Sequence, residues 1–305
     1  MHIFPKSYEK FKCIAEKCKH NCCIGWEIDV DEESAAFYES VPGDFGKRLR
    51  NSIEKGEVPC FILGENERCP FLNRDNLCDI IINLGEDKLC TICSEHPRFH
   101  NELPDRTESG VGMACEEAAR IILTEKEQFS LINHAASEDE IITLRDRLIA
   151  VLTNREKSID SRVLQMLREA GASLPEKSIA EWAKIFLSLE RLDEKWTEIL
   201  CSLSVNDTSA FRVHMEDRMT EYEQFLCYLI YRHFANSWDL TEAAARAAFA
   251  ALGYKIIFAA GAATFEQSGS FTVEDQVELC RLFSSEVEYS EENLSMLFEV
   301  LKNEE

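Results

Sequence analysis

The sequence predicts a mostly α-helical protein in which a small, irregular, cysteine-rich domain precedes an α-helical domain. Two observations support this prediction. Ten of the thirteen cysteines and six of the seven prolines lie within the first 115 residues. Beyond Cys115 the chain is rich in Ala, Glu, Leu and Arg, contains only Pro175, and shows helical periodicity. We therefore expect one domain over residues 1–125 and a second over residues 126–305.

Short helices and turns are expected in the first domain. Residues 31–40 and 46–56 have the composition of short helices, and residues 87–95 predict another that ends before Pro97. Residues 74–76 are turn formers between apolar flanks. Residues 69–80 therefore predict a turn between two short strands.

Amphipathic helical patterns follow one another through the second domain. The first begins near Cys115 and places Ala118, Ile121 and Ile122 on one face. Further helices are expected over residues 141–154, 161–174, 176–192, 219–238, 241–260, 273–283 and 291–301. The residues expected to cap helices are Ser137 (with Glu140 completing a capping box), Asp160, Asp239 and Thr272.

The charge and hydropathy of the chain exclude several classes of partner. A net charge of −23 argues against nucleic acid or an anionic membrane as the main partner, because both require an excess of Lys and Arg. Residues 1–12 lack the apolar core of a signal peptide, and the longest apolar stretch, residues 255–265, is shorter than a membrane span. We expect a cytoplasmic protein, and in a reducing compartment clustered cysteines indicate metal ligands rather than disulfides.

Nine of the N-terminal cysteines fall in clusters whose spacing is typical of metal or iron–sulfur ligands. They are Cys13, Cys18, Cys22, Cys23, Cys69, Cys78, Cys90, Cys93 and Cys115. Ligands three to five residues apart can surround one centre without a long loop. Nine candidates exceed one four-ligand site, so either two sites exist or some of these cysteines only pack beside one. The isolated cysteines are interpreted as small buried packing residues: Cys60, Cys201, Cys227 and Cys280.

The identity of the centre stays open between zinc and a [4Fe–4S] cluster. Structural zinc favours paired CxxC motifs, and only Cys90 and Cys93 have that spacing. The irregular spacing of the first four cysteines favours the iron–sulfur cluster. His20 and His96 lie inside the cysteine clusters, either as ligands or in an outer-shell role.

Four segments together resemble the flagellin lysine-N-methylase family over roughly residues 8–125. The segments are FKCIAEKCKHNCCIGWEIDVD, CPFLNRDNLCDIIINLGEDKLC, CSEHPRFH and CEEAARIIL. The nine clustered cysteines fall on the cysteine positions of this pattern, with Cys90 or Cys93 preceding Pro97-Arg98. Gly25, Trp26 and Asp29 match the segment behind the Cys-Cys pair. One departure is Glu116, which stands where the family pattern has proline.

The resemblance implies a cytoplasmic enzyme that transfers a methyl group from S-adenosylmethionine to lysine side chains of flagellin or of another lysine-bearing protein. It also implies a cysteine-ligated iron–sulfur cluster. Whether the cluster binds S-adenosylmethionine directly or only stabilises the small domain remains open. Two alternatives from other classes remain: a non-enzymatic zinc- or iron–sulfur-binding module that recognises a protein, and a redox protein.

The sequence contains no glycine-rich GxGxG turn of a Rossmann-type methyltransferase, since Gly110 and Gly112 are too few and follow no clear strand. It therefore assigns no catalytic or cofactor-binding residue. A carboxylate or tyrosine near the site could relay the proton of the lysine amine. Candidates for that role are Asp29, Tyr38, Glu95, Tyr228 and Tyr231, while Arg98 could bind the cofactor carboxylate and Trp26 could stack on adenine.

Overall fold

The computed structural model describes residues 1–203 and 207–302. Its contacts divide the chain into two compact units. The cysteine unit comprises Lys12–Phe99, and the helical unit comprises Met1–Phe11 together with His100–Glu305. The mostly α-helical class predicted from the sequence is confirmed. The sequence placed a single boundary at residue 125, whereas the contacts group the first eleven residues and residues 100–125 with the helices.

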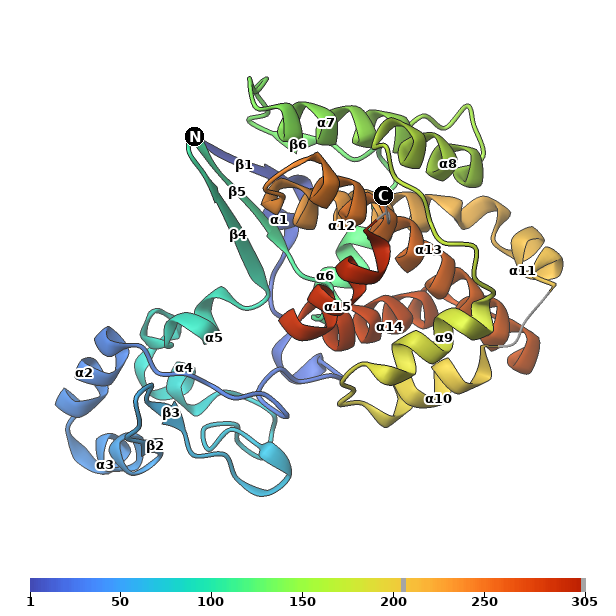
Figure 1. The fold of residues 1–305 in the computed structure, drawn as a ribbon. Helices are drawn as coiled ribbons and strands as arrows, with labels where there is room; N and C mark the ends of the chain where they lie inside the picture. The colour runs from blue at the N-terminus through green and yellow to red at the C-terminus, as the bar shows by residue number, and fades with distance from the viewer. Residues whose placement is uncertain (204–206, 303–305) are drawn as a thin grey trace. The chain divides into compact units, whose positions relative to one another are not determined.

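The cysteine unit consists of short elements joined by turns (Figure 1). Its helices and strands are α2 (Glu32–Ser40), α3 (Gly43–Asn51), β2 (Ile53–Glu54), β3 (Cys60–Phe61), α4 (Asp79–Leu84) and α5 (Thr91–Glu95). The three short helices predicted in this region are present as α2, α3 and α5, although α3 ends at Asn51, before strand β2, and α5 begins only at Thr91. The two strands predicted within residues 69–80 are instead a single bridge between Leu72 and Cys78, after which α4 begins.

The core of the cysteine unit is aromatic. Tyr38 and Leu49 are fully buried, and Phe61 packs edge-on against Phe71 with ring centroids 5.0 Å apart. The hydroxyl of Tyr38 donates a hydrogen bond to the carbonyl of Lys88 at 2.8 Å. Several cysteines complete this core, so their thiols lie where apolar side chains would otherwise pack.

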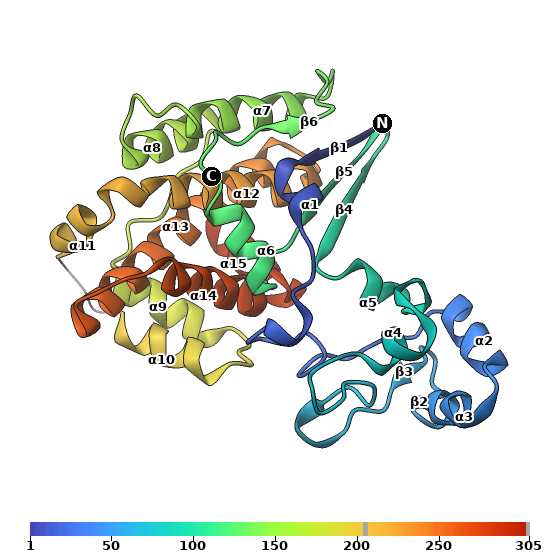
Figure 2. The same ribbon diagram turned by 180° about the vertical axis from the view of Figure 1, so that it is seen from behind.

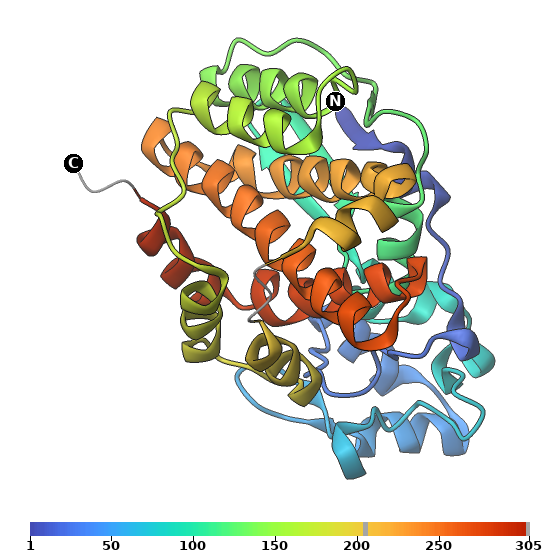
Figure 3. The same cartoon turned by 90° about the vertical axis from the view of Figure 1, so that its right-hand side faces the viewer.

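The helical unit is built around α12, α13 and α14, which pack against one another. Its elements are β1 (His2–Pro5), α1 (Lys6–Lys10), β4 (Arg98–Leu103, whose first two residues lie in the cysteine unit), β5 (Arg106–Val111), α6 (Glu116–Leu123), β6 (Leu131–Ile132), α7 (Glu140–Leu152), α8 (Ile159–Glu169), α9 (Ile179–Ser188), α10 (Glu194–Ser202), α11 (Ser209–His214), α12 (Met219–His233), α13 (Leu240–Ser268), α14 (Val273–Phe283) and α15 (Glu291–Leu301). A π-helical segment, Ser284–Glu288, continues from α14. Figure 3 shows α7 and α8 side by side, in green.

A small mixed sheet, which the sequence did not predict, joins the start of the chain to residues 98–132. Its strand order is β4-β5-β1-β6. Strand β1 runs parallel to β5, with Ile3 opposite Glu108, and antiparallel to β6. Figure 2 shows β1, β4 and β5 together, with α1 beside them. This pairing explains why the first eleven residues belong to the helical unit.

Helix α13 is the central core helix. Nineteen of its twenty-nine residues are buried, and the buried residues lie on all of its faces. By length and composition alone α13 could span a bilayer, although no membrane span was predicted from the sequence. However, 83% of its most apolar 18-residue segment is buried inside the protein. Residues 256–263 of the apolar stretch identified in the sequence are all buried within α13.

Two of the four predicted helix caps are confirmed and two are wrong. Asp239 caps α13 and Thr272 caps α14, the latter in a capping box with Asp275. Helix α8 is capped by Ser158 and not by Asp160, and α7 is capped by Asp139 and not by Ser137. The carboxylate of Asp139 accepts the N–H groups of Ile141 and Ile142 at 2.8 and 3.0 Å.

Replacing Asp139 with alanine is expected to lower the free energy of unfolding by about 1 kcal/mol, because two backbone N–H groups lose their acceptor. Ser137→Ala removes one exposed hydrogen bond, to the N–H of Asp139, and is expected to cost less than half as much. Urea denaturation of both variants measures the difference. Equal losses would contradict the assignment of the cap to Asp139.

Candidate functional site

Five of the nine predicted cysteine ligands gather in one part of the cysteine unit. Cys69 and Cys90 belong to its buried core. Cys23, Cys78 and Cys93 are partly buried and pack against that core. A backbone hydrogen bond joins the segment that contains Cys23 to the segment that contains Cys69: the N–H of Cys69 donates to the carbonyl of Cys23 at 2.8 Å.

The thiols in this group influence one another electrostatically. The Sγ atoms of Cys90 and Cys93 are 3.4 Å apart, and the hydrogen bond between them lowers the pKa of Cys90 and raises that of Cys93. A hydrogen bond with Cys22 and burial raise the pKa of Cys23, and the negative charges of Cys69 and Cys78 raise it further. Deprotonating one thiol therefore opposes deprotonation of its neighbours unless a cation is present.

The chemistry of these donors suits a thiolate-bound centre, but the side chains are not arranged around one ion. Two thiolates on a tetrahedral zinc ion lie about 3.8 Å apart, since each Zn–S bond is about 2.3 Å, and the Cys90–Cys93 pair comes near that spacing. Among the described residues, however, no three His, Cys, Asp or Glu side chains converge closely enough to hold a metal ion. A metal or iron–sulfur centre here is therefore a proposal.

The remaining clustered cysteines occupy different surroundings. Cys13 and Cys22 are exposed, and Cys18 is half-buried with its thiol donating to the carbonyl of His20. Cys115 does not lie in the cysteine unit at all: it is the N-cap residue of α6 in the helical unit. All thirteen cysteines lie in the described part of the chain, and none forms a disulfide.

The four isolated cysteines do not share one environment. Cys227 and Cys280 are fully buried, as predicted. Cys60 is half-buried in β3. Cys201 is exposed on α10, so its interpretation as a buried residue is wrong.

The proposed proton-relay residues have different surroundings. The hydroxyl of Tyr38 is occupied by a backbone carbonyl, Asp29 and Glu95 are exposed, and the hydroxyl of Tyr231 donates to the carbonyls of Ile3 and Ser109. Trp26 and Arg98 are half-buried, and Arg98 donates to the carbonyl of Ser94. Tyr228 is different, because it belongs to a buried polar network.

This network lies in the helical unit and joins α12 to the π-helical segment. The hydroxyl of Tyr228 lies 3.2 Å from Glu288 Oε1, and His233 Nε2 lies 2.7 Å from Glu288 Oε2. Arg232 Nη1 donates to the hydroxyl of Tyr228 at 2.7 Å, and its guanidinium carbon lies 4.6 Å from the ring centre of Tyr289. Tyr228, Arg232 and His233 belong to α12, and Glu288 is the last residue of the π-helical segment. Such π-helical turns are frequent at functional sites.

The charges of the network are fixed by its surroundings. Burial raises the pKa of Glu288, but Arg232 and the hydrogen bond with His233 outweigh burial, and the net shift is downward. Burial lowers the pKa of His233. At neutral pH Glu288 is therefore a carboxylate that accepts from a neutral imidazole and from the phenol of Tyr228.

A glycine allows this network to contact the loop between β5 and α6. A Cβ atom at Gly112 would lie 2.3 Å from the hydroxyl of Tyr289 and 2.7 Å from Arg232 Nη1, so no larger residue fits without rearrangement. The next residue, Met113, donates its backbone N–H to the hydroxyl of Tyr228 at 3.1 Å. The prediction that Gly110 and Gly112 follow no strand is wrong, because Gly110 is the penultimate residue of β5.

Sequence reasoning named Tyr228 but missed the other members of the network. Arg232 and His233 follow it on α12 as ordinary helix residues, and Glu288 lies far away along the chain. The spacing of four residues places Tyr228 and Arg232 on one face of a helix, but no local spacing joins either of them to Glu288. A possible signal was the density of polar residues in the otherwise apolar α12, since buried polar groups require partners.

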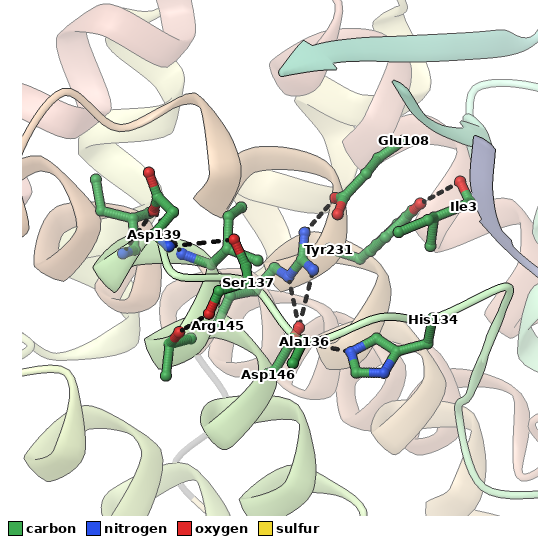
Figure 4. A network of polar contacts seen from close by, with 12 residues as sticks. Ile3, Glu108, His134, Ala136, Ser137, Asp139, Arg145, Asp146 and Tyr231 are labelled. Atoms are coloured by element: carbon green, nitrogen blue, oxygen red, sulfur yellow. Dashed lines mark hydrogen bonds and ion pairs between the residues drawn. The ribbon is translucent and has the colours of Figure 1, made fainter. Parts of the chain in front are cut away.

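A second buried network fixes the sheet to α7 (Figure 4). Arg145 and Glu108 are both fully buried and form an ion pair between α7 and β5. Arg145 also donates to Asp146 at 2.8 Å, and Asp146 contacts His134 at the surface. The second carboxylate oxygen of Glu108 is buried and accepts no hydrogen bond in the described structure.

Comparison with known proteins places the chain in a family. Residues 111–305, which contain the Tyr228 network and Cys115, match the family model described as the FliB lysine N-methylase C-terminal domain. The chain belongs to this family. The predicted membership in the flagellin lysine-N-methylase family is thus confirmed, through residues 111–305 rather than through the cysteine segments that first indicated it.

Similar proteins from this family carry related names. The chain is 26% identical over 179 residues to the lysine-N-methylases of Salmonella typhimurium and Salmonella choleraesuis, a match that covers 55% of this chain and 43% of each relative. It is 26% identical over 137 residues to the flagellar biosynthetic protein FliU of Salmonella muenchen, covering 42% of this chain and 79% of that relative. The chain thus spans less than half the length of the two lysine-N-methylases it matches. No solved structure matches it.

Proposed function

We propose that this member of the FliB family is a protein-lysine N-methyltransferase that uses S-adenosylmethionine and acts on flagellin in the cytoplasm. The observation that carries the proposal is the match of residues 111–305 to the lysine N-methylase domain. The names of two relatives support the activity, and the name of the third supports a flagellar substrate. The net charge of −23 also favours association with a lysine-bearing protein surface.

The overall reaction sets what the site must provide. A bond forms between the lysine nitrogen and the methyl carbon, the carbon–sulfur bond breaks, and the sulfonium leaves as a neutral thioether with the electron pair. The attacking amine must be neutral and aligned with the methyl group, and it releases one proton to a base or to water. The chain must therefore hold both reactants in a fixed orientation and exclude bulk water.

The proposal includes a thiolate-bound centre in the cysteine unit. The cysteines best placed to hold it are Cys23, Cys69, Cys78, Cys90 and Cys93, because these five share one region of the core. The resemblance to the family supports a [4Fe–4S] cluster, while the 3.4 Å separation of the Cys90 and Cys93 sulfurs favours a single zinc ion. Such a centre would organise this small unit, whose short elements bury few apolar side chains.

Methyl transfer can be tested with protein purified without oxygen, S-adenosylmethionine labelled in its methyl group, and flagellin. We expect label on flagellin lysines, located by mass spectrometry of peptides. Flagellin whose lysines have been acetylated is the matched control and should remain unlabelled. Unlabelled native flagellin, in the presence of bound S-adenosylmethionine, would contradict the proposed substrate.

The nature of the centre is a separate measurement on the same sample. Iron and acid-labile sulfide in a brown protein would support the cluster. Stoichiometric zinc in a colourless protein would support the alternative. A protein that contains neither, yet methylates flagellin, would contradict the proposed centre and leave the proposed activity intact.

A further inference from the structure

Resting on the proposed function, we propose that Tyr228, Arg232 and Glu288 are positioning residues for methyl transfer, and that they act through the loop Gly112–Cys115. This loop joins the carboxyl end of β5 to the N-terminus of α6. The three side chains hold it from the interior of the helical unit.

The loop is held at two neighbouring backbone positions. The N–H of Met113 donates to the hydroxyl of Tyr228, and the α-carbon of Gly112 lies against Arg232 and Tyr289. Hydrogen bonds to backbone and contacts with a glycine fix the path of the chain rather than the rotamer of one side chain. The network therefore determines where residues 114 and 115 lie.

Tyr228, Arg232 and Glu288, here called the clamp, are themselves held rigidly. The hydroxyl of Tyr228 accepts from Met113 and Arg232 and donates to Glu288, which leaves it one orientation. Glu288 is fixed in turn by His233 at 2.7 Å. Each group is locked by a second one, which is the arrangement that a reaction site needs to keep its geometry.

Stability alone does not explain these residues. Burying Arg232, His233 and Glu288 removes polar groups from water, and apolar side chains of similar size commonly stabilise such an interior equally well or better. The part of the loop beyond the clamp reaches solvent, because Ala114 and Cys115 are only half-buried. A rigid interior network beneath a solvent-accessible loop fits a role in presenting that loop.

The position of the loop in the fold agrees with this role. The loop Gly112–Cys115 begins directly after the carboxyl end of β5, the strand that pairs with β1. The segment that matches the lysine N-methylase domain begins at residue 111, where the strand ends and the loop follows. The clamp and the loop thus both lie within the part of the chain that carries the family resemblance.

The test compares two tyrosines of α12. Tyr228→Phe removes the hydroxyl that holds the loop, whereas Tyr222→Phe removes a buried hydroxyl that has no hydrogen-bond partner in the described structure. We expect Tyr228→Phe to lower kcat for flagellin methylation by about 100-fold with little change in KM, because a small displacement of the loop misaligns the reactants. Tyr222→Phe should stay within about twofold of the wild type in both constants.

Two further measurements separate positioning from general damage to the fold. Amide exchange at Met113 should accelerate in Tyr228→Phe and not in Tyr222→Phe. Glu288→Gln keeps hydrogen-bonding atoms but loses the charge, and it should also lower kcat. If Tyr228→Phe does not fold, the kcat of Glu288→Gln tests the positioning role. Equal kcat values for the Tyr228 and Tyr222 variants would overturn the positioning role, whereas a wild type that labels no lysine would overturn the proposed function first.

Discussion

Cys90→Ser is expected to remove the proposed metal or cluster and to abolish the proposed methylation of flagellin. Cys90 is fully buried, its sulfur lies 3.4 Å from that of Cys93, and it belongs to the same core as Cys69. A serine hydroxyl matches the thiol in shape but remains protonated at neutral pH and is a poor ligand for soft metal ions. The measurements are metal and sulfide content per chain and the rate of label transfer to flagellin.

Cys201→Ser provides the control for this prediction, because Cys201 is exposed on α10 of the helical unit. It should retain full metal content and full activity. Cys13→Ser is expected to have an effect between those of Cys90→Ser and Cys201→Ser, since Cys13 is exposed and lies outside the group of five core cysteines. A Cys90→Ser protein that keeps its metal would contradict the assignment of the centre to the core cysteines, even if activity were lost.

Most of the longer helices could be predicted from the sequence because their apolar residues recur with helical spacing, whereas the short helices α1, α4, α10 and α11 were not predicted. The sheet could not be predicted in the same way. Strand β1 has four residues and ends in Pro5, and its partners β5 and β6 lie more than a hundred residues further along the chain. Parallel pairing over such a separation leaves no local pattern, because it depends on contacts that form only in the folded chain.

Local chemistry also decided which cap predictions were right. Asp239 and Thr272 are the last polar residues before a clear helical pattern, and both are caps. Before α7 three polar residues follow one another, and the pattern of Ser137 and Glu140 resembles a capping box. The nearer Asp139 is the cap because its carboxylate reaches two N–H groups of the first turn.

The candidate site, too, could be predicted from the sequence only where its residues lie in neighbouring segments. Clustering in the sequence correctly indicated that Cys23, Cys69, Cys78, Cys90 and Cys93 share one region, since their segments are short and turn-rich. It did not indicate that Cys115 belongs to a different compact unit. The Tyr228–Glu288 contact joins two helical segments that each look ordinary, so only the fold brings these side chains together.

Replacing Arg145 with methionine is expected to lower the free energy of unfolding by about 3–5 kcal/mol, because Glu108 is then left as a fully buried carboxylate without a cation. The double variant Glu108→Leu with Arg145→Met should regain most of this loss, since the interior then contains no uncompensated charge. Arg147→Met is the matched control two residues away on α7, where the arginine is mostly exposed and 3.8 Å from Glu169, and it should change stability by less than about 0.5 kcal/mol. Urea denaturation of the three variants gives the comparison. If the double variant were as unstable as Arg145→Met, the loss would come from packing around the sheet and α7 rather than from the buried charge.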